Sequence, residues 1–426
     1  MKRSPPPSGG GWGGGLQQDC KPYTLVPTFI TNFVLNRIML KLPIYLDHNA
    51  TTPCDPRVME VMLPYFTEQF GNAASRSHSF GWQAEEAVDY AREQVARLIG
   101  AEPKEIIFTS GATEGDNLAI KGVFEMYAGK GNHIITCVTE HKAVLDTCKH
   151  IEKLGGTVTY LPVNKEGLID LQQLEAAITP RTILIAIMYA NNETGTIQPV
   201  KAIGALAKKH NVLFFTDATQ AVGKIPVDVI KDEIDILACS AHKLYGPKGV
   251  GALYVRRKNP RVRLTAQMDG GGHEKGMRSG TLNVPGIAGF GKAADICRQQ
   301  LEADGERMSE LRNKLENALL QLEATYVNGS QMHRLPHVAN ISFNFVNGDQ
   351  LMMGLNKEIA LSSGAACTSA SMEPSYVLKA LGVEDDLAHS SLRFSIGRYT
   401  TEEQIDYVTE RVKKTVEQLR TNQLAN

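Results

Sequence analysis

The chain has 426 residues, of which 42% are hydrophobic and 21% charged, and its formal net charge is -1. The length suits two domains of ordinary size, and the composition is typical of a soluble globular protein. The charge balance gives no reason to expect nucleic acid or a membrane surface as partner, and no apolar run is long enough to span a bilayer.

Residues 1–41 are predicted to be a low-complexity, disordered extension, because their proline and glycine runs cannot build a core. The apolar stretch 25–40 contains a proline and a charge and has no small-residue cleavage site, which disfavours a secretory signal. An organelle transit peptide would be richer in arginine and serine. We favour a start at Met39, since the folded pattern begins at Leu42.

From residue 42 onward, short apolar runs alternate with amphipathic stretches. The apolar runs predict buried strands at 105–110, 133–138, 157–163, 182–190, 212–218 and 236–241, and the amphipathic stretches predict helices such as 85–99 and 200–210. Strands separated by helices predict an α/β fold with a mostly parallel sheet that helices cover on both faces. We assign residues 42–295 to this large domain, whose first residues could pack with the second domain.

After residue 290 the pattern changes. A charged helix is predicted at about 293–324, strands at 337–346 and 392–397, and a last amphipathic helix at about 401–420. We interpret residues 296–426 as a smaller α+β domain.

The predicted sheet should carry a site at the carboxyl ends of its strands, where open α/β sheets bind ligands. The strand 105–110 leads into Gly111, Ala112 and Thr113 at the start of a helix. Small residues at such a turn expose backbone N–H groups, and a helix N-terminus favours an anion. The turn is therefore a phosphate cradle or an ordinary helix cap.

Two further predicted strands end in polar and ionisable residues that could bind or react with a ligand. Asp217 ends the strand 212–218, with Gln220 three residues on, and Ser240, His242 and Lys243 end the strand 236–241. A buried carboxylate needs a partner, and the two interpretations are a structural cap or salt bridge and a contact to a protonated ring nitrogen. A lysine beside an apolar strand is either a snorkelling structural residue or an amine suited to Schiff-base chemistry.

Two other residues stand out by their surroundings. His141 follows the strand 133–138, where it is either a capping residue or one that stacks on a cofactor or relays protons. Cys367 lies in a run of small polar residues, 362–371, which predicts a mobile loop with an accessible thiol rather than a linker with an incidental cysteine.

The remaining cysteines carry no such signal. The chain has seven cysteines, an odd number without a CxxC pair, which argues against a disulfide framework and a structural zinc site. We therefore expect a reducing compartment, a cytoplasmic protein and no resident metal, with most cysteines buried as small hydrophobes.

A series of motifs then resembles one family in order and in content. They include YLDHNATTP (45–53), FTSGATEGDNLAIKG (108–122), TEHKAVLDTC (139–148), TDATQAVGK (216–224), SAHKLYGPKGVGALYVRR (240–257), GGGHEKGMRSGT (270–281) and SSGAACTSASMEPSYVLKALG (362–382). The chain is similar over residues 42 to about 420 to cysteine desulfurases of the IscS/NifS type. These are class V aminotransferases with the fold-type I architecture of pyridoxal-phosphate enzymes. The loop reads Gly-Ala-Ala-Cys where many relatives read Gly-Ser-Ala-Cys, a change that we expect to be tolerated.

The resemblance implies a cofactor, pyridoxal 5'-phosphate, and a role for each matching residue. The implied roles are a Schiff base and proton transfer for Lys243, the pyridinium partner for Asp217, the donor to the ring hydroxyl for Gln220, and the stacking acid–base group for His141. Ala112, Thr113, Ser240 and His242 are implied to hold the phosphate. Thr281 is implied to reach the phosphate across a homodimer interface, and Asn192 and Arg393 to bind the substrate carboxylate.

The resemblance also implies the reaction. L-cysteine would lose its sulfur to Cys367 as a persulfide, leaving L-alanine. The sulfur would then pass to an iron–sulfur scaffold, where Cys367 could carry it to or ligate a nascent cluster, or to a tRNA-thiolation relay. Selenocysteine lysis and transamination use the same lysine and acid, whereas Cys367 alone points to sulfur. An inactive interaction protein or a dinucleotide-binding protein is disfavoured, because the catalytic set is complete and no strand-GxGxxG-helix motif occurs.

Overall fold

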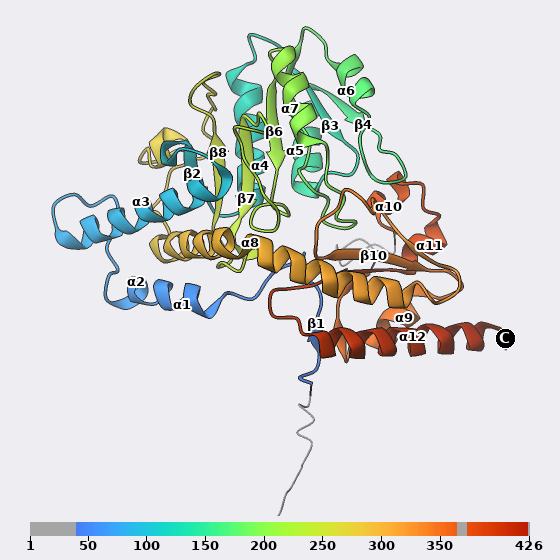
Figure 1. Ribbon diagram of the computed structural model, residues 1–426. Coiled ribbons are helices and arrows are strands. Elements are labelled where there is room, and N and C mark those ends of the chain that lie inside the picture. The colour runs from blue at the N-terminus through green and yellow to red at the C-terminus, as the bar shows by residue number, and fades with distance from the viewer. Residues whose placement is uncertain (1–39, 364–372, 425–426) are drawn as a thin grey trace, which may run out of the picture. The chain divides into compact units, whose positions relative to one another are not determined.

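The computed structural model describes residues 40–363 and 373–424, whose helices and strands are drawn in Figure 1. Cys367 and nearly all of the predicted N-terminal extension therefore lie outside the described residues. The described end of that extension, Leu40 and Lys41, forms neither helix nor strand.

The largest sheet has seven strands in the order β2-β8-β7-β6-β5-β3-β4. Its strands are β2 (Ile106–Thr109), β3 (His133–Cys137), β4 (Thr157–Leu161), β5 (Thr182–Ala186), β6 (Leu213–Asp217), β7 (Ile236–Ser240) and β8 (Gly251–Val255). All run in one direction except β8, which is antiparallel to both of its neighbours. The predicted α/β fold with a mostly parallel sheet is confirmed.

Continuous apolar runs suit these strands because both faces of the sheet are covered. In β6, Phe214 packs into the cluster that contains Val95 of one helix layer, while Phe215 packs on the opposite face with Leu118 and Val144. The helices of this region are α1 (Pro56–Met62), α2 (Pro64–Thr67), α3 (Ser79–Ile99), α4 (Ala112–Met126), α5 (Lys142–Lys153), α6 (Leu171–Ala177) and α7 (Val200–Lys209). Single 3-10 turns lie at η1 (Pro103–Glu105), η2 (Ala241–Lys243) and η3 (Glu274–Gly276).

The C-terminal region has its own core around a four-stranded antiparallel sheet of order β12-β13-β10-β9. These strands are β9 (Thr325–Val327), β10 (Val338–Phe343), β12 (Ser362–Ser363) and β13 (Ser391–Ser395). The accompanying helices are α8 (Val284–Leu319), α9 (Gly348–Leu355), α10 (Tyr376–Ala380), α11 (Asp385–His389) and α12 (Glu402–Leu424). Near the start of the chain, β1 (Ile44–Tyr45) pairs with β11 (Ile359–Ala360), so the first described residues do pack with this region.

Several elements differ from their predicted bounds, among them the helix predicted at 85–99, which begins at Ser79. The strand predicted at 182–190 ends at Ala186, after which the apolar chain leaves the sheet although the Tyr189 N–H still donates to the Asp217 carbonyl. The helix predicted from about 293 begins at Val284, with Asn283 as its cap. The glycines in the first turns of this helix have low helix propensity, so the sequence does not predict its start. They permit close packing, since a Cβ on Gly291 would lie 2.5 Å from the Ala91 Cα.

The long helix α8 runs beneath the large sheet and on below β10, as Figure 1 shows. Its first half packs against α1 and α3, and the helix also contacts β10 and α12. One continuous helix thus spans the position at which a boundary between two domains was predicted, residues 295 and 296. The division at that position stays a prediction.

Candidate active site

A cavity of about 640 Å³ opens at the carboxyl ends of the parallel strands. The parallel pairing explains its position, because the segments that follow β3, β5, β6 and β7 all emerge at one edge of the sheet. Its lining comes from the turns and loops at that edge, from an N-terminal turn and from β13, namely 49–51, 110–114, Asp116, His141, Met188, Ala190, Asn192, Asp217, Thr219, Gln220, Ser240, His242, Lys243, Lys248, Gly249 and Arg393.

Among the described residues, every predicted site residue except Thr281 lines this cavity. Thr281 is exposed and does not line it, so its predicted role stays untested. The structure therefore brings together residues that span almost three hundred positions of the sequence, while their individual roles stay predictions.

One end of the cavity is suited to an anion. The N-terminus of the fifteen-residue helix α4 contributes Ala112 and Thr113 to the lining, which also includes Ser240 and Lys248. The turn can approach β8 closely only because Gly251 has no side chain, since a Cβ there would lie 2.7 Å from the Gly111 Cα. Backbone N–H groups, hydroxyls and an ammonium are the donors that a phosphate group requires.

His242 contributes to this end as a neutral imidazole. Burial, together with the charges of Lys243 and Lys248, lowers the pKa of His242 to about 4. Its Nδ1 lies 3.1 Å from the Thr51 hydroxyl oxygen, which ties the strand end to the N-terminal turn. A neutral ring offers an anion one N–H donor without adding a full charge.

The other end of the cavity is acidic. Asp217 is buried at the end of β6, where its Oδ1 accepts from the Thr219 N–H at 2.9 Å. Behind it, Asp116 of α4 is fully buried, and burial, with the Asp217 and Glu140 carboxylates, raises its pKa well above the usual range. The two acidic side chains lie near one another at the cavity, where an acidic group would stabilise a cationic ring nitrogen.

Lys243 also lines the cavity and lies in η2, directly after β7. Its Nζ donates to the carbonyl oxygens of Asn49 and Ala50, the latter at 2.9 Å. Gln220 donates to the same Asn49 oxygen at 3.0 Å. The N-terminal turn thus holds the lysine side chain within the cavity.

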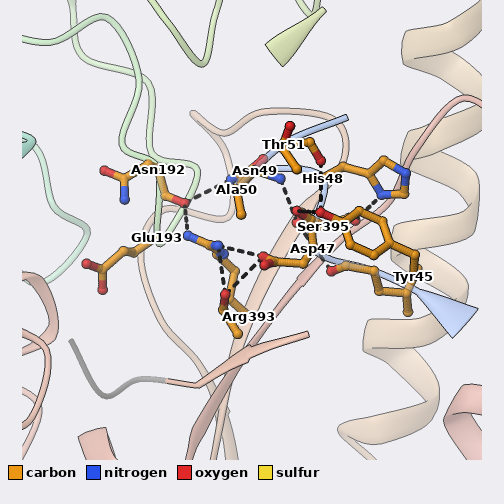
Figure 2. A network of polar contacts seen from close by, with 12 residues as sticks. Tyr45, Asp47, His48, Asn49, Ala50, Thr51, Asn192, Glu193, Arg393 and Ser395 are labelled. Carbon is orange, nitrogen blue, oxygen red and sulfur yellow. Dashed lines mark hydrogen bonds and ion pairs between the residues drawn. The ribbon is translucent and has the colours of Figure 1, made fainter. Parts of the chain in front are cut away.

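Arg393 of β13 brings the small sheet into the cavity lining. Figure 2 shows its side chain between Asn192 and Asp47. Its guanidinium donates to the Asn192 carbonyl at 2.9 Å and to the Asp47 carboxylate at 2.7 Å. Asn49 also donates to the Asn192 carbonyl, at 2.9 Å. A planar guanidinium held at its edge of the cavity is suited to a carboxylate ligand.

His141 has the capping role that the sequence suggested, while its role toward a cofactor stays a prediction. It caps α5, since its Nδ1 accepts from the Ala143 N–H at 3.2 Å, and its exposed ring lines the cavity. The capping contact holds the ring at the start of α5, beside the cavity.

The residues present fit a ligand with a phosphate at one end and a protonated ring nitrogen at the other. Four lining side chains carry buried polar atoms without a hydrogen-bond partner, namely Asn192 Oδ1, Thr219 Oγ1, both oxygens of Asp116 and Arg393 Nε. Such atoms are costly unless a ligand or solvent satisfies them. The donor set and the orphaned atoms together indicate a polar ligand.

Sequence reasoning assigned no role to several lining residues, chiefly Asn49, Asp116, Thr219 and Lys248. Asn49 and Asp116 lie inside the motifs YLDHNATTP and FTSGATEGDNLAIKG, so their positions could have been flagged. Nothing local, however, reveals that a residue near the start of the chain contacts Lys243.

The fold and the cavity define a class of α/β enzyme that the comparisons with known proteins make specific. The sequence pattern of aminotransferase class V matches residues 44–408. Cysteine desulfurase IscS of Anaeromyxobacter sp. is 58% identical over 382 residues, which cover 89% of this chain and 94% of that protein. The protein of the same name from Actinobacillus succinogenes is 60% identical over 383 residues, with the same coverage.

Solved structures agree with these relatives. A NifS-like protein has a TM-score of 0.81 at 39% identity, covering 89% of this chain and 99% of its own. A structure described as SspA in complex with cysteine has a TM-score of 0.74 at 38% identity, covering 84% and 100%. The chain belongs to the class V aminotransferase family and, within it, to the cysteine desulfurases.

Two further findings concern the described ranges alone. No helix within them has the length and apolar character needed to cross a bilayer. In the same ranges, no three or more His, Cys, Asp or Glu side chains are grouped so that they could hold a metal ion.

Proposed function

We propose that this cysteine desulfurase removes sulfur from L-cysteine with pyridoxal 5'-phosphate as cofactor, and holds the sulfur as a persulfide on Cys367. The observation that carries the proposal is the meeting of Lys243, Asp217 and Arg393 in one cavity. The names of the relatives and the cysteine-bound neighbour support the substrate.

The cavity offers a holder for each part of the cofactor. Ala112, Thr113, Ser240 and His242 would hold the phosphate, Asp217 the ring nitrogen, Gln220 the ring hydroxyl and Lys243 the aldehyde carbon. When bound, the cofactor supplies an electron sink for the carbanion formed at the substrate Cα.

The protein's own groups would do the remaining work. Arg393 and the Asn192 amide would bind the substrate carboxylate, which places the Cα hydrogen within reach of the Lys243 amine. Lys243 would take the proton from Cα and return it, and His141 at the cavity mouth would serve as a second acid–base group. Burial of Asp217 strengthens its contact with a cationic nitrogen, because few waters screen it.

The sulfur step would belong to Cys367. Its thiolate attacks the substrate sulfur, so an S–S bond forms while the C–S bond breaks, and the electron pair of that bond remains on the substrate carbon. Protonation of this carbon yields L-alanine, and the overall balance is L-cysteine plus the Cys367 thiol giving L-alanine plus the Cys367 persulfide. The persulfide sulfur would pass to an acceptor, either an iron–sulfur scaffold or a tRNA-thiolation relay.

A homodimer is part of the proposal, with Thr281 of each chain completing the phosphate site of the other. Thr281 is exposed, and several large apolar side chains of the segment 63–90 are exposed as well: Leu63 57%, Phe66 59%, Phe70 64%, Trp82 56% and Tyr90 59%. Exposed apolar side chains in such number are typical of an interaction surface. Light scattering should show a dimer, and Thr281→Ala should weaken cofactor retention; a monomer with full activity would contradict this part.

The activity is tested by measuring sulfide and alanine release from L-cysteine with a thiol reductant, for the wild type and Cys367→Ala. We expect equal amounts of both products, and loss of both in the variant while the cofactor absorbance persists. If the wild type keeps its cofactor and releases neither product, the sulfur chemistry is wrong. The other class V reactions, selenocysteine lysis and transamination, would then be measured with the same protein.

A further inference from the structure

The placement of Arg393 depends on a register that joins three distant segments. Ser362 of β12 lies directly opposite Arg393 of β13 in the antiparallel ladder. Asp47 pairs with Ser395, two residues along β13 and on the same face as Arg393. Residues 47, 362 and 393 are thereby brought to one side of the small sheet.

The contacts of the guanidinium follow from this register. Arg393 donates from NH2 to the Asp47 Oδ1 at 2.7 Å and to the Ser362 hydroxyl oxygen at 3.0 Å. Ser362 in turn donates to the same Asp47 oxygen at 2.9 Å, so the three side chains form a closed triangle. NH1 donates to the Asn192 carbonyl, and Nε has no hydrogen-bond partner although it is buried.

Asp47 is itself held rigidly. Its carbonyl accepts from the Tyr45 hydroxyl and from the Ala50 N–H, each at 3.0 Å, which closes the turn that also carries Asn49. Figure 2 shows Asp47 beside Arg393 and Tyr45, below this turn. The Asp47 carboxylate that contacts Arg393 is therefore attached to a backbone segment that hydrogen bonds hold in place.

Asp47 and Ser362 are absent from the cavity lining, whereas Arg393 and Asn192 belong to it. The triangle therefore holds NH2 of the guanidinium from outside the cavity. Because NH1 also donates to the Asn192 carbonyl, the Nε–H and one N–H of NH1 remain for a ligand. The side chain of Arg393 is 6% exposed and that of Asp47 is 19% exposed, so water screens the contact only partly.

We propose that Asp47, assisted by Ser362, is the positioning residue that orients Arg393 toward the substrate carboxylate. The inference rests on the proposed function, since it takes Arg393 as the carboxylate ligand. A long arginine side chain loses rotamer freedom when it binds in one geometry, and a carboxylate that holds it beforehand reduces that cost of binding. Asp47 would thus determine affinity for substrates that carry a carboxylate, and it would not act on the reacting sulfur.

The test compares two ligands that differ only in the carboxylate, L-alanine and ethylamine. Each is titrated into the holoenzyme while the cofactor absorbance is followed, for the wild type, Asp47→Ala, Asp47→Asn and Ser362→Ala. We expect Asp47→Ala to weaken L-alanine binding about tenfold and leave ethylamine binding unchanged, since one charge-assisted contact is removed. Asp47→Asn keeps an accepting oxygen and should lose less than threefold, and Ser362→Ala should lose about two- to threefold.

Turnover supplies a second readout, in which KM for L-cysteine should rise in Asp47→Ala with little change in kcat. A matched control is Glu358→Ala, which removes another carboxylate–arginine contact of the C-terminal region, 3.0 Å to Arg411, away from the cavity. That variant should bind both ligands as the wild type does.

Three results would overturn the inference: equal weakening of both ligands in Asp47→Ala, unchanged or tighter binding of L-alanine, or failure of Asp47→Asn to restore binding. A failure of the proposed function looks different. In that case the wild type releases no sulfide, yet the L-alanine and ethylamine titrations still report whether Asp47 controls carboxylate affinity.

Discussion

Two walls of the cavity were assembled in different ways. The wall at the edge of the seven-stranded sheet carries Asp217, Ser240 and Lys243, each at the end of a buried strand. The opposite wall carries Arg393 from the small sheet and Asn49 from the N-terminal turn. Both side chains donate hydrogen bonds to the Asn192 carbonyl, which is more than one hundred and forty positions away from each of them.

The two walls differ in the ligand that their side chains fit. The large-sheet wall holds the groups that fit a cofactor, namely an anion cradle, a carboxylate and an amine. The small-sheet wall holds the guanidinium that fits a substrate carboxylate. If this separation is correct, changes to the first wall should affect cofactor retention, and changes to the second should affect substrate affinity while the cofactor stays bound.

The largest effect is expected at the large-sheet wall with Lys243→Ala. Without its amine, the chain has no group at this position to attach the cofactor or to move the Cα proton, so alanine release should fall on the order of 10³-fold or more. The visible absorbance of the attached cofactor should disappear as well. The control is Lys201→Ala, which removes an exposed lysine of α7 outside the cavity lining and should keep the attached cofactor. An attached cofactor in Lys243→Ala would contradict the assignment.

The opposite wall is tested by Arg393→Lys. A lysine keeps the charge but cannot reproduce the guanidinium contacts to Asn192 and Asp47, and it binds a carboxylate through a single point. The lost contact should cost about 2 kcal/mol, which raises KM for L-cysteine roughly 30-fold. Cofactor content, measured by absorbance after dialysis, should not change. Loss of the cofactor in this variant would break the division between the two walls.

Asn49 joins the walls, and Asn49→Ala tests that junction. The amide donates to the Asn192 carbonyl, and its Oδ1 lies 2.8 Å from the Nε2 of the fully buried His337. Burial, aided by nearby cations, lowers the pKa of His337 well below its usual value, so a neutral buried ring would lose its partner. The free energy of unfolding should fall by about 1–3 kcal/mol in urea denaturation.

The control for that measurement is Asn317→Ala, at an exposed position of α8. Stability there should change by less than about 0.5 kcal/mol. Equal, small effects of both substitutions would show that the junction contributes nothing to holding the walls together.

The last prediction concerns the effect of pH on the acidic cluster that includes Glu140 and Asp116. Burial, with a smaller contribution from Asp217, raises the pKa of Glu140 from 4.5 to about 8, while its Oε1 accepts from the Met188 N–H. Between these two values the folded protein keeps a proton that the unfolded chain releases, so stability falls as the pH rises through this window. Glu140→Gln mimics the protonated acid and should make the fall shallower, with Asp116 adding to the slope in both proteins.

Denaturation at several pH values between 5 and 8 measures this slope. Glu125→Gln, an exposed glutamate of α4, is the matched control and should leave the slope unchanged. An equal slope for the wild type and Glu140→Gln would show that the buried carboxyl does not hold its proton.

The large sheet was well predicted because its strands are short apolar runs between amphipathic helices. The six predicted strands exist, and their mostly parallel order follows from the helices between them. Errors arose where the local signal is ambiguous. The apolar run continues to Ala190, beyond the end of β5 at Ala186. The glycines near the start of α8 have low helix propensity, so about nine residues of this helix, which tertiary packing stabilises, were not predicted.

By itself, the sequence determined the chemistry of the large-sheet wall. Residues that end neighbouring parallel strands must meet at one edge, so Asp217 and Lys243 could be placed together without a structure. Only the tertiary structure decided the opposite wall, since β1 adds to β11 and Asp47 reaches Arg393 across 346 positions. The physical reason is that strand register depends on hydrogen bonds between distant segments, whereas periodicity and propensity describe only neighbours along the chain.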